Sequence, residues 1–232
     1  MKTKVTTKAG TETKARTAAT GEVEKGLELE FRPLTPDRWA DFEALFGARG
    51  ACGGCWCMFF RLTRSEFERG KGDGNRVAMK ALVDGGEVPG ILAYAAGEPI
   101  GWCAVAPRER FGALARSRVL APLDASPVWS VVCFFVDRRF RRRGVSERLL
   151  RAACDWAAGR GAETVEGYPT EPRKGSMPDV FAYMGLPAAF ARAGFSEAAR
   201  RSPQRPILRR GSSVESRGSR AEVRYHRARR ST

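Results

Sequence analysis

Apolar residues between positions 27 and 210 follow first the spacing of a strand and then that of a helix. Apolar and charged residues alternate over 27–31, which predicts a strand. The Thr-Pro-Asp sequence at 35–37 is typical of a helix start with proline in the first turn. Four apolar residues then share one face of the predicted helix: Trp39, Phe42, Leu45 and Phe46.

The rest of the chain continues this succession. A glycine- and cysteine-rich turn over 50–57 precedes a second helical region, which is predicted to break at 70–74, restart at Asn75 and end near Gly85. The later predicted elements are a hairpin of strands 91–95 and 100–105, a connection over 107–127, a strand at 128–136, a helix at 145–158, a strand at 164–168, a Pro- and Gly-rich loop at 169–187, a helix at 188–193, and strands near 195–201 and 206–209. This order predicts an α/β class, with a mixed sheet that carries helices on both faces.

The junction between strand 128–136 and helix 145–158 is the most informative segment. A basic loop leads through Gly144 into a helix whose apolar residues recur every four positions. Free N–H groups and the positive end of the helix dipole meet at such a turn, beside Arg141, Arg142 and Arg143. The segment therefore predicts a site for a phosphate or pyrophosphate, with a basic surface turn as the alternative.

The details of this loop resemble a known motif. It lacks the spacing of a nucleotide P-loop or a dinucleotide fold. After Val136 the chain reads Asp137-Arg138-Arg139-Phe140 and then Arg-x-x-Gly-x-Ser, with Leu149-Leu150 in the helix. This resembles motif A of the GNAT N-acetyltransferase superfamily, in which an Arg/Gln-x-x-Gly-x-Gly/Ala loop holds the pyrophosphate of acetyl-CoA. Ser146 stands where the family has glycine or alanine.

The resemblance implies a GNAT-like acyl-CoA N-acyltransferase fold, in which two central strands splay apart and acetyl-CoA lies between them as co-substrate. It implies main-chain contacts to the pantetheine arm from Phe134, Phe135 and Val136. The implied pyrophosphate loop consists of Arg141, Arg142, Arg143, Gly144, Val145 and Ser146. The implied reaction is direct attack of an amine on the thioester, for which orientation of the reactants supplies much of the acceleration.

The chain departs from the family at the expected general acid. GNAT proteins often carry Tyr-x-x-x-Gly-Phe in the last helix, where the tyrosine protonates coenzyme A. The matching segment here begins with Phe190, which has no proton to give but is expected to lie beside the cofactor. Tyr183 is the preferred candidate for the acid and Tyr168 the other one, and water remains open.

The general base is also open. The positions at which many relatives carry a glutamate are Ser130 and Val132 here. Glu166, at the end of the following predicted strand, is a candidate that could reach the cleft directly or through a water, or could instead pair with an arginine at the surface. The one histidine, His226, lies in the basic tail, so we do not expect histidine catalysis.

The cysteines admit several interpretations. Cys52, Cys55 and Cys57 have a spacing seen in zinc sites, but no second cysteine pair completes a tetrahedral set, so no metal is expected. Cys133 could be an acyl-accepting nucleophile, although a buried cysteine is more often a small hydrophobe. The segment from Cys55 to Arg61 is predicted to form either an apolar wall for the acceptor amine or ordinary core.

The net charge of +15 is concentrated at the two ends of the chain. Residues 200–232 contain eleven arginines and two glutamates, whereas residues 27–199 have a balance ordinary for an enzyme. We predict a disordered tail over 1–26, a GNAT-like domain over 27–210, and a basic disordered tail over 211–232. The chain contains neither a signal-like apolar segment nor a membrane span, and its cysteines suit a reducing compartment, which predicts a cytoplasmic enzyme that does not bind membranes.

These observations predict an N-acetyltransferase that transfers an acetyl group from acetyl-CoA to a primary amine of a small molecule or peptide. Two alternatives remain. The chain could be a catalytically silent acyl-CoA-binding module, because Phe190 and the missing glutamates weaken the catalytic pattern. It could bind nucleic acid through its arginine tail, although that tail has one aromatic residue and no recognisable module. Whether the chain forms a homodimer is left open.

Overall fold

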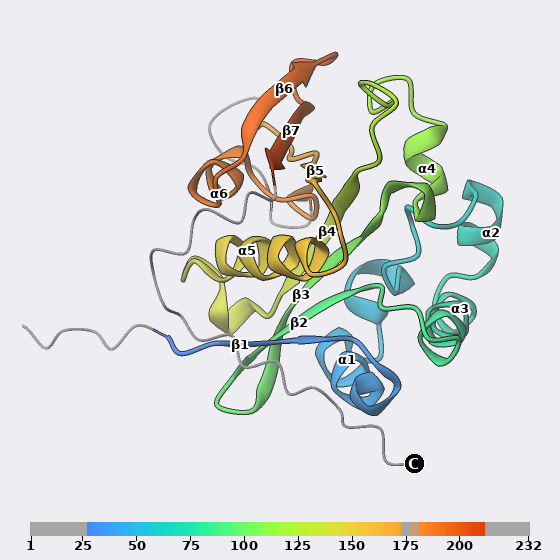
Figure 1. The fold of residues 1–232 in the computed structure, drawn as a ribbon. Helices are drawn as coiled ribbons and strands as arrows, with labels where there is room; N and C mark the ends of the chain where they lie inside the picture. Colours follow the sequence, from blue (N-terminus) through green and yellow to red (C-terminus); the bar gives the residue numbers. More distant parts are fainter. Residues whose placement is uncertain (1–26, 173–177, 179–180, 212–232) are drawn as a thin grey trace, which may run out of the picture.

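The computed structural model describes residues 27–172, 178 and 181–211. Within them a seven-stranded sheet has the order β1-β2-β3-β4-β5-β7-β6 (Figure 1). Strands β4 and β5 pair in parallel, and the other neighbouring pairs are antiparallel. The strands are β1 (Glu30–Pro33), β2 (Gly90–Ala95), β3 (Glu98–Pro107), β4 (Trp129–Val136), β5 (Thr164–Gly167), β6 (Ser196–Arg200) and β7 (Pro206–Gly211).

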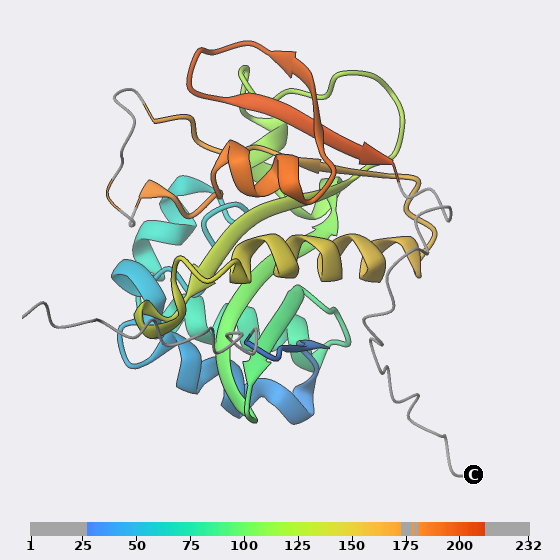
Figure 2. The ribbon, with the colours of Figure 1, turned by 90° about the vertical axis from the view of Figure 1, so that its left-hand side faces the viewer.

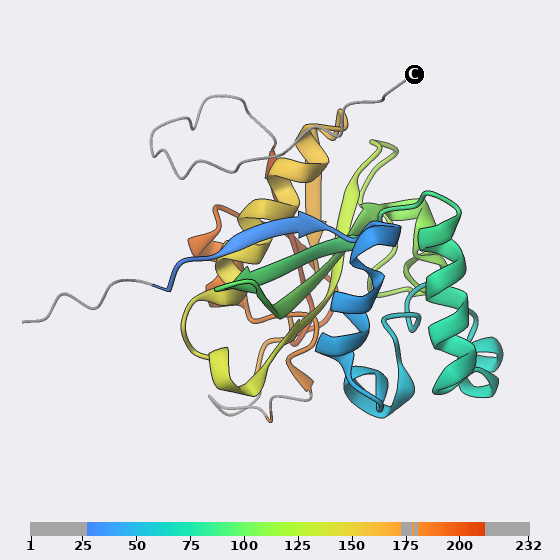
Figure 3. The same cartoon turned by 90° about the horizontal axis from the view of Figure 1, so that it is seen from below.

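Helices cover both faces of the sheet (Figure 3). One face carries α1 (Trp39–Phe46), α2 (Arg64–Arg69) and α3 (Asp73–Asp84), and the other carries α5 (Val145–Ala158) and α6 (Pro187–Arg192). Figure 2 shows α5 lying along the sheet with α6 beside it. The shorter elements are the turns Pro36–Arg38, Gly50–Gly54, Arg108–Arg110 and Arg138–Phe140 and the helix α4 (Gly112–Ala115).

The two faces of β3 show why the central strands have continuous apolar sequences. Trp102 and Ala104 point to the core beneath α1, while Cys103 and Val105 point to the core beneath α5. Because successive side chains of a strand alternate between faces, a strand covered on both sides must be apolar at every position. The chain therefore has two cores that share the central strands.

Helix α5 packs on β2 and β3 through a stripe of small and branched side chains. Val145, Leu149 and Ala153 recur at four-residue spacing and are buried. Close packing also depends on Gly101 in β3, where a Cβ atom would lie 3.1 Å from Leu149 Cδ1. The helix therefore holds its N-terminus in a set position beside the carboxyl end of β4.

The structure confirms the predicted fold class and the predicted order of helices and strands. The predicted bounds of the first strand are wrong, since β1 covers Glu30–Pro33 rather than 27–31 and is positioned by pairing with Ile91–Tyr94 of β2. Helix α3 begins at Asp73, two residues before the predicted restart. The predicted tails lie outside the described residues, apart from Gly211. No described helix is both long and apolar enough to span a membrane.

Replacing Gly167 by alanine is expected to destabilise the fold. A Cβ atom there would lie 1.9 Å from Phe190 Cε1, so the buried ring has to move. Overpacking of this kind costs about 1–3 kcal/mol. Urea unfolding of Gly167→Ala should show that loss, whereas Gly211→Ala, in another strand but with open space around it, should be nearly neutral. Equal stability of the two variants would contradict the packing described here.

Candidate active site in the splay between β4 and β5

The parallel pair of β4 and β5 separates within the sheet. Trp129–Val131 pair with Val165–Gly167, and β4 then continues to Val136 without β5 beside it. Backbone groups on this edge of β4 must find other partners, because an unpaired buried N–H or C=O is costly. The Phe134 N–H donates to the Tyr183 carbonyl at 2.6 Å, and the Val136 carbonyl accepts from Arg141 Nε at 2.9 Å.

A β-bulge in β4 sets which side chains face each side of the splay. Val131 is opposite Val105 and Cys133 is opposite Ala104, so Val132 is the extra residue. As a result, Val132 and Cys133 both pack toward α1, although they are adjacent in sequence. Phe134 points to the opposite face, toward α5 and α6.

The loop that follows β4 forms a candidate anion site at the start of α5. Gly144 caps the helix with a left-handed φ of 73°, and no side chain caps this end. The first-turn N–H groups from Val145 onward have no acceptor within the helix, and the dipole makes this end positive. Arg142 is exposed beside it, and a Cβ atom on Gly144 would meet nothing within 4 Å. This arrangement can hold a phosphate group.

A cavity of about 830 Å³ joins this anion site to an aromatic pocket beneath α1. The β4–α5 loop, α5 and the end of α6 line one end of the cavity, which we call the anion half. Its residues include Phe140, Arg141, Arg142, Gly144, Val145, Ser146, Glu147 and Arg192. The other end, which we call the acceptor half, is lined by residues from α1, the 51–60 segment, α2, β4 and the 181–183 segment, including Phe46, Cys52, Cys55, Cys57, Phe59, Phe60, Phe67, Cys133, Phe135 and Tyr183. One continuous space therefore adjoins both a helix N-terminus that can hold a phosphate and an apolar pocket.

The structure brings most of the residues predicted for the site to this cavity. The ones that line it are Phe134, Phe135, Val136, Arg141, Arg142, Gly144, Val145, Ser146 and Tyr183. Arg143 is exposed on the same loop but is not part of the lining. Phe190 also lies outside the lining, because its ring is fully buried against Gly167, Gly185 and Phe134.

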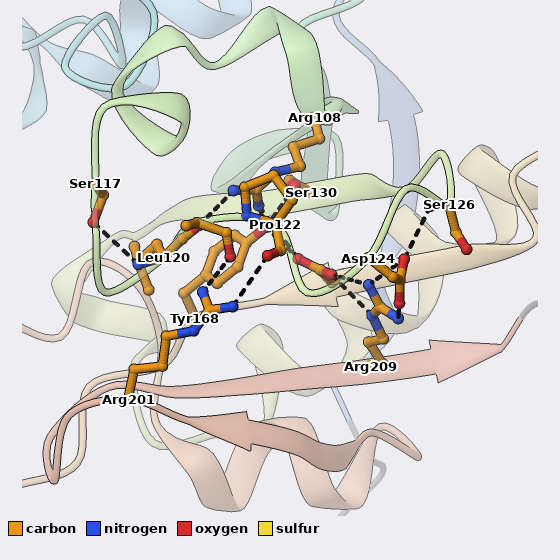
Figure 4. Close-up of polar contacts among 12 residues, drawn as sticks. Arg108, Ser117, Leu120, Pro122, Asp124, Ser126, Ser130, Tyr168, Arg201 and Arg209 are labelled. Atoms are coloured by element: carbon orange, nitrogen blue, oxygen red, sulfur yellow. Dashed lines mark hydrogen bonds and ion pairs between the residues drawn. The ribbon is translucent and has the colours of Figure 1, made fainter.

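Glu166 does not line the cavity and instead belongs to a buried polar network. Figure 4 labels its partners Arg108, Tyr168 and Arg209. The Glu166 side chain is 1 % exposed, and it accepts from Arg209 Nε at 2.9 Å and Nη2 at 2.7 Å and from Arg108 Nη1 at 3.3 Å. The Tyr168 hydroxyl donates to it at 2.8 Å and also bonds Ser130 at 2.8 Å. The expectation that Glu166 reaches the cleft is not met here, because both carboxylate oxygens are held by these partners.

Three other positions discussed for proton transfer, Ser130, Val132 and Tyr168, are also buried and do not line the cavity. Ser130, at one of the two positions where many relatives carry a glutamate, belongs to the same network, and Val132, at the other, is buried in the core beneath α1. Burial, together with the Glu166 carboxylate, raises the pKa of Tyr168 far above its usual value. Of the two tyrosines considered for the acid, Tyr183 is therefore the one that borders the cavity.

Tyr183 is half-buried between two phenylalanine rings and an arginine. Its ring centroid lies 6.4 Å from those of both Phe59 and Phe60. Burial raises the pKa of the phenol, and Arg205 opposes that effect through charge and a hydrogen bond. The phenol consequently keeps its proton at neutral pH and can act as a hydrogen-bond donor toward the cavity.

The cysteines show a grouping that the sequence did not predict. All six are free thiols, and no cluster in the described part of the chain has the ligands for a metal ion. Four of them, Cys52, Cys55, Cys57 and Cys133, line the acceptor half. Cys133 is a candidate nucleophile from the sequence because of its place in the strand. Its grouping with Cys57 depends on two segments that are distant in the chain, so no local sequence pattern indicates it.

Comparison with known proteins now identifies the family. The model of the acetyltransferase (GNAT) family matches residues 56–178, more than half of the chain. The chain therefore belongs to the GNAT acetyltransferase family and is an acyltransferase. No curated protein sequence matches it.

Solved structures with low sequence identity share the fold. The crystal structure of arylalkylamine N-acetyltransferase 2 from Aedes aegypti is 12% identical, with a TM-score of 0.51 over 80% of this chain and 99% of that one. A GNAT acetyltransferase from Listeria monocytogenes is 13% identical, with a TM-score of 0.50 over 81% of this chain and 96% of that one. At such identities these similarities establish the architecture alone.

Proposed function

We propose that this acyltransferase uses acetyl-CoA to acetylate a primary amine on a small molecule or peptide whose body is largely apolar. The observation that carries the proposal is the single cavity that connects an anion-binding helix end to an aromatic pocket at the splay of β4 and β5. A thioester carrier with two linked phosphates matches the first part, and an apolar amine matches the second.

The anion half suits a pyrophosphate in both charge and geometry. Main-chain donors at Val145 and Ser146 open α5, and Arg141 and Arg142 add positive charge to the rim. Gly144 leaves the space over the helix end open, since nothing lies within 4 Å of a Cβ atom built there. These features support assigning the loop to the phosphates of acetyl-CoA, with the pantetheine arm directed along β4.

The edge of β4 must rearrange for part of this binding mode. The Phe134 N–H, which the proposal offers to the pantetheine arm, is bonded to the Tyr183 carbonyl in the described structure. A ligand that uses this amide has to displace that carbonyl. The described 181–183 segment would then change position when acetyl-CoA binds.

The acceptor half favours an amine with an apolar body. Its walls consist mainly of phenylalanine rings and cysteine sulfurs. Of the described residues that line the whole cavity, Glu147 is the one carboxylate, and it pairs with Arg151 and Arg192 at the opposite end. A polycationic acceptor would therefore find no carboxylate in the acceptor half, whereas an aromatic or aliphatic amine would bury apolar surface.

The proposed chemistry is direct attack of the neutral amine on the thioester. The cavity has to hold both reactants in line, and Tyr183 is the proposed donor of a proton to the departing thiolate of coenzyme A. The free thiols of all six cysteines agree with a cytoplasmic location, which we also propose. The division into a 27–210 domain with two tails remains part of the proposal.

The experiment that tests this function measures binding and turnover separately. Acetyl-CoA should raise the melting temperature of the protein by mass action. A panel of aromatic, aliphatic and polycationic primary amines should then be screened for release of coenzyme A thiol and for N-acetylated product by mass spectrometry. Turnover confined to apolar amines supports the proposal. A melting shift without turnover would favour the alternative of a silent acyl-CoA-binding module, and no shift would contradict both.

Replacing Tyr183 by phenylalanine is expected to lower kcat by at least about tenfold and to leave the melting shift with acetyl-CoA unchanged, because only the proton donor is lost. Tyr168→Phe is the comparison, since that hydroxyl bonds Ser130 and Glu166 outside the cavity. It should cost stability without a comparable loss of kcat. Steady-state thiol release measures kcat of both variants. A larger loss of kcat in Tyr168→Phe than in Tyr183→Phe would make Tyr168 the proton donor instead of Tyr183.

A further inference from the structure

Two thiols from distant segments meet on the wall of the acceptor half. Cys57 follows the turn Gly50–Gly54, and Cys133 lies in β4 next to the bulge. Both line the cavity, and each thiol affects the pKa of the other. Neither takes part in a disulfide, so the pair presents sulfur chemistry at the place proposed for the amine.

The backbone holds Cys57 in a conformation that L-residues rarely adopt. Trp56 has a φ of 40° and Cys57 a φ of 57°, two consecutive non-glycine residues in the left-handed region. The Trp56 ring fixes this turn by stacking on Trp39 at 6.4 Å and Phe46 at 5.7 Å. Such backbone strain concentrates at functional sites, where it can aim a side chain.

The surroundings of the Cys57 sulfur favour its thiolate form. Trp102 Nε1 donates to Cys57 Sγ at 3.2 Å from β3, and the Cys133 thiol faces it from β4. Arg61, on the same segment, adds positive charge. The Cys133 hydrogen bond, with Trp102 and Arg61, lowers the pKa of Cys57 although burial opposes the shift. Thiolates gain more from such donors than thiols do.

Other titratable groups of the acceptor half have pKa values shifted in the opposite direction, upward. Burial raises the pKa of Cys55, and the hydrogen bond to Cys57 raises that of Cys133. Burial also raises the pKa of Tyr183. Cys103, on the opposite face of β3 in the core beneath α5, has its pKa raised by burial as well. Among the described groups of this half with a shifted pKa, Cys57 is thus the one whose pKa is lowered, so it is the thiol best suited to exist as a thiolate that takes up a proton.

We propose that Cys57 is the catalytic proton acceptor, taking a proton from the ammonium group of the bound amine onto its sulfur. The neutral amine then attacks the thioester carbonyl, the C–S bond breaks, and the second nitrogen proton ends on the coenzyme A sulfur by way of Tyr183. Cys57 returns its proton to water. Cys133 acts as a positioning residue that donates to the Cys57 thiolate. This inference rests on the proposed function.

A purely structural role predicts different results. In that case Cys57 serves only to accept the hydrogen bond of the buried Trp102 indole, which the hydroxyl of serine can also do. The decisive variant is therefore Cys57→Ser, which keeps an acceptor for the indole but removes the ionisable thiol. Cys154→Ala is the matched control, since that thiol is buried under α5 and does not line the cavity.

Turnover of the best amine by the full-length protein gives the first readout. We expect Cys57→Ser to lower kcat about a hundredfold and to keep the melting shift with acetyl-CoA, whereas Cys154→Ala stays within a factor of about three. We expect Cys133→Ala to move the acidic limb of kcat/KM to higher pH, since the thiolate loses a donor. Full activity of a folded Cys57→Ser would overturn the proposal. If Cys57→Ser fails to fold, the proposal is overturned when the acidic limb of kcat/KM in Cys133→Ala lies at the same pH as in wild type.

Ionisation without substrate gives the second readout. The ultraviolet absorbance of thiolate is titrated with pH in wild type and in Cys57→Ser. Wild type should show one transition below the ordinary thiol pKa of about 8.5, and Cys57→Ser should lack it. Cys154→Ala should retain that transition. If wild type binds acetyl-CoA but acetylates none of the amines, the proposed function is contradicted. The titration still decides whether the pKa of Cys57 lies below that of an ordinary thiol. A transition at or above the ordinary range would overturn the assignment of Cys57.

Discussion

Replacing Gly144 by glutamate is expected to abolish the rise in melting temperature produced by acetyl-CoA. The new carboxylate would occupy the open space over the first turn of α5 and repel the two phosphates. Ligand at a hundred times its dissociation constant stabilises a protein by about 2.7 kcal/mol, and this whole contribution should disappear. Thermal unfolding of wild type and variant over a series of acetyl-CoA concentrations measures it.

Two controls separate charge at the anion site from backbone strain. Gly144 has a left-handed φ of 73°, so any side chain there costs some stability without ligand. Gly144→Ala carries the same strain but no charge and should keep most of the melting shift. Gly161→Glu places the same residue at another left-handed glycine with open space, beyond the far end of α5, and should respond fully. A full response from Gly144→Glu would show that the phosphates bind elsewhere.

Replacing Glu166 by alanine is expected to lower the free energy of unfolding by about 3–5 kcal/mol, the usual cost of breaking a buried ion pair by removing one partner. The Arg108 and Arg209 guanidinium groups would lose the carboxylate that both contact, and the Tyr168 hydroxyl would lose its acceptor. Arg209 keeps Asp124 as a second partner, which limits the loss on that side. Urea unfolding at neutral pH measures the difference.

The matched control is Glu163→Ala, three residues away and exposed, which should stay within about 0.5 kcal/mol of wild type. Glu166→Gln adds a test of role, because it keeps the shape of the side chain and removes the charge. We expect that variant to lose stability while kcat, measured below its unfolding temperature, stays close to wild type. A stable Glu166→Gln with a large kcat loss would instead restore the catalytic role considered from the sequence.

The β4–α5 junction was predictable because its signals are local. The apolar sequence of the strand, the glycine that starts the helix and the four-residue spacing after it all lie within 131–157. The structure starts α5 at Val145 and ends it at Ala158, as predicted. Most of the proposed anion site lies in this same contiguous stretch, so its residues can be named from a motif in the sequence without knowledge of any distant contact.

Residues whose position depends on distant partners were harder to place. Strand β1 is positioned by its pairing with β2, about sixty positions along the chain, so the local alternation of 27–31 gave the wrong bounds. Glu166 lies at the end of the predicted strand, from which it could reach a cleft, but Arg108 and Arg209 hold it in a buried network. Phe190 matches a family position, yet it packs into the core beside Gly167.

The amino-acid sequence alone determined the class of fold, the order of its elements and the loop that can hold a pyrophosphate. Spacing of apolar residues and backbone preferences of glycine and proline act over a few residues, and they can be recognised in the chain itself. The tertiary structure decided which side chains share the cavity. The meeting of Cys57, Trp102 and Cys133 requires a strained turn, a bulge and two neighbouring strands to come together. Because such contacts arise only from packing between distant segments, no local pattern records them.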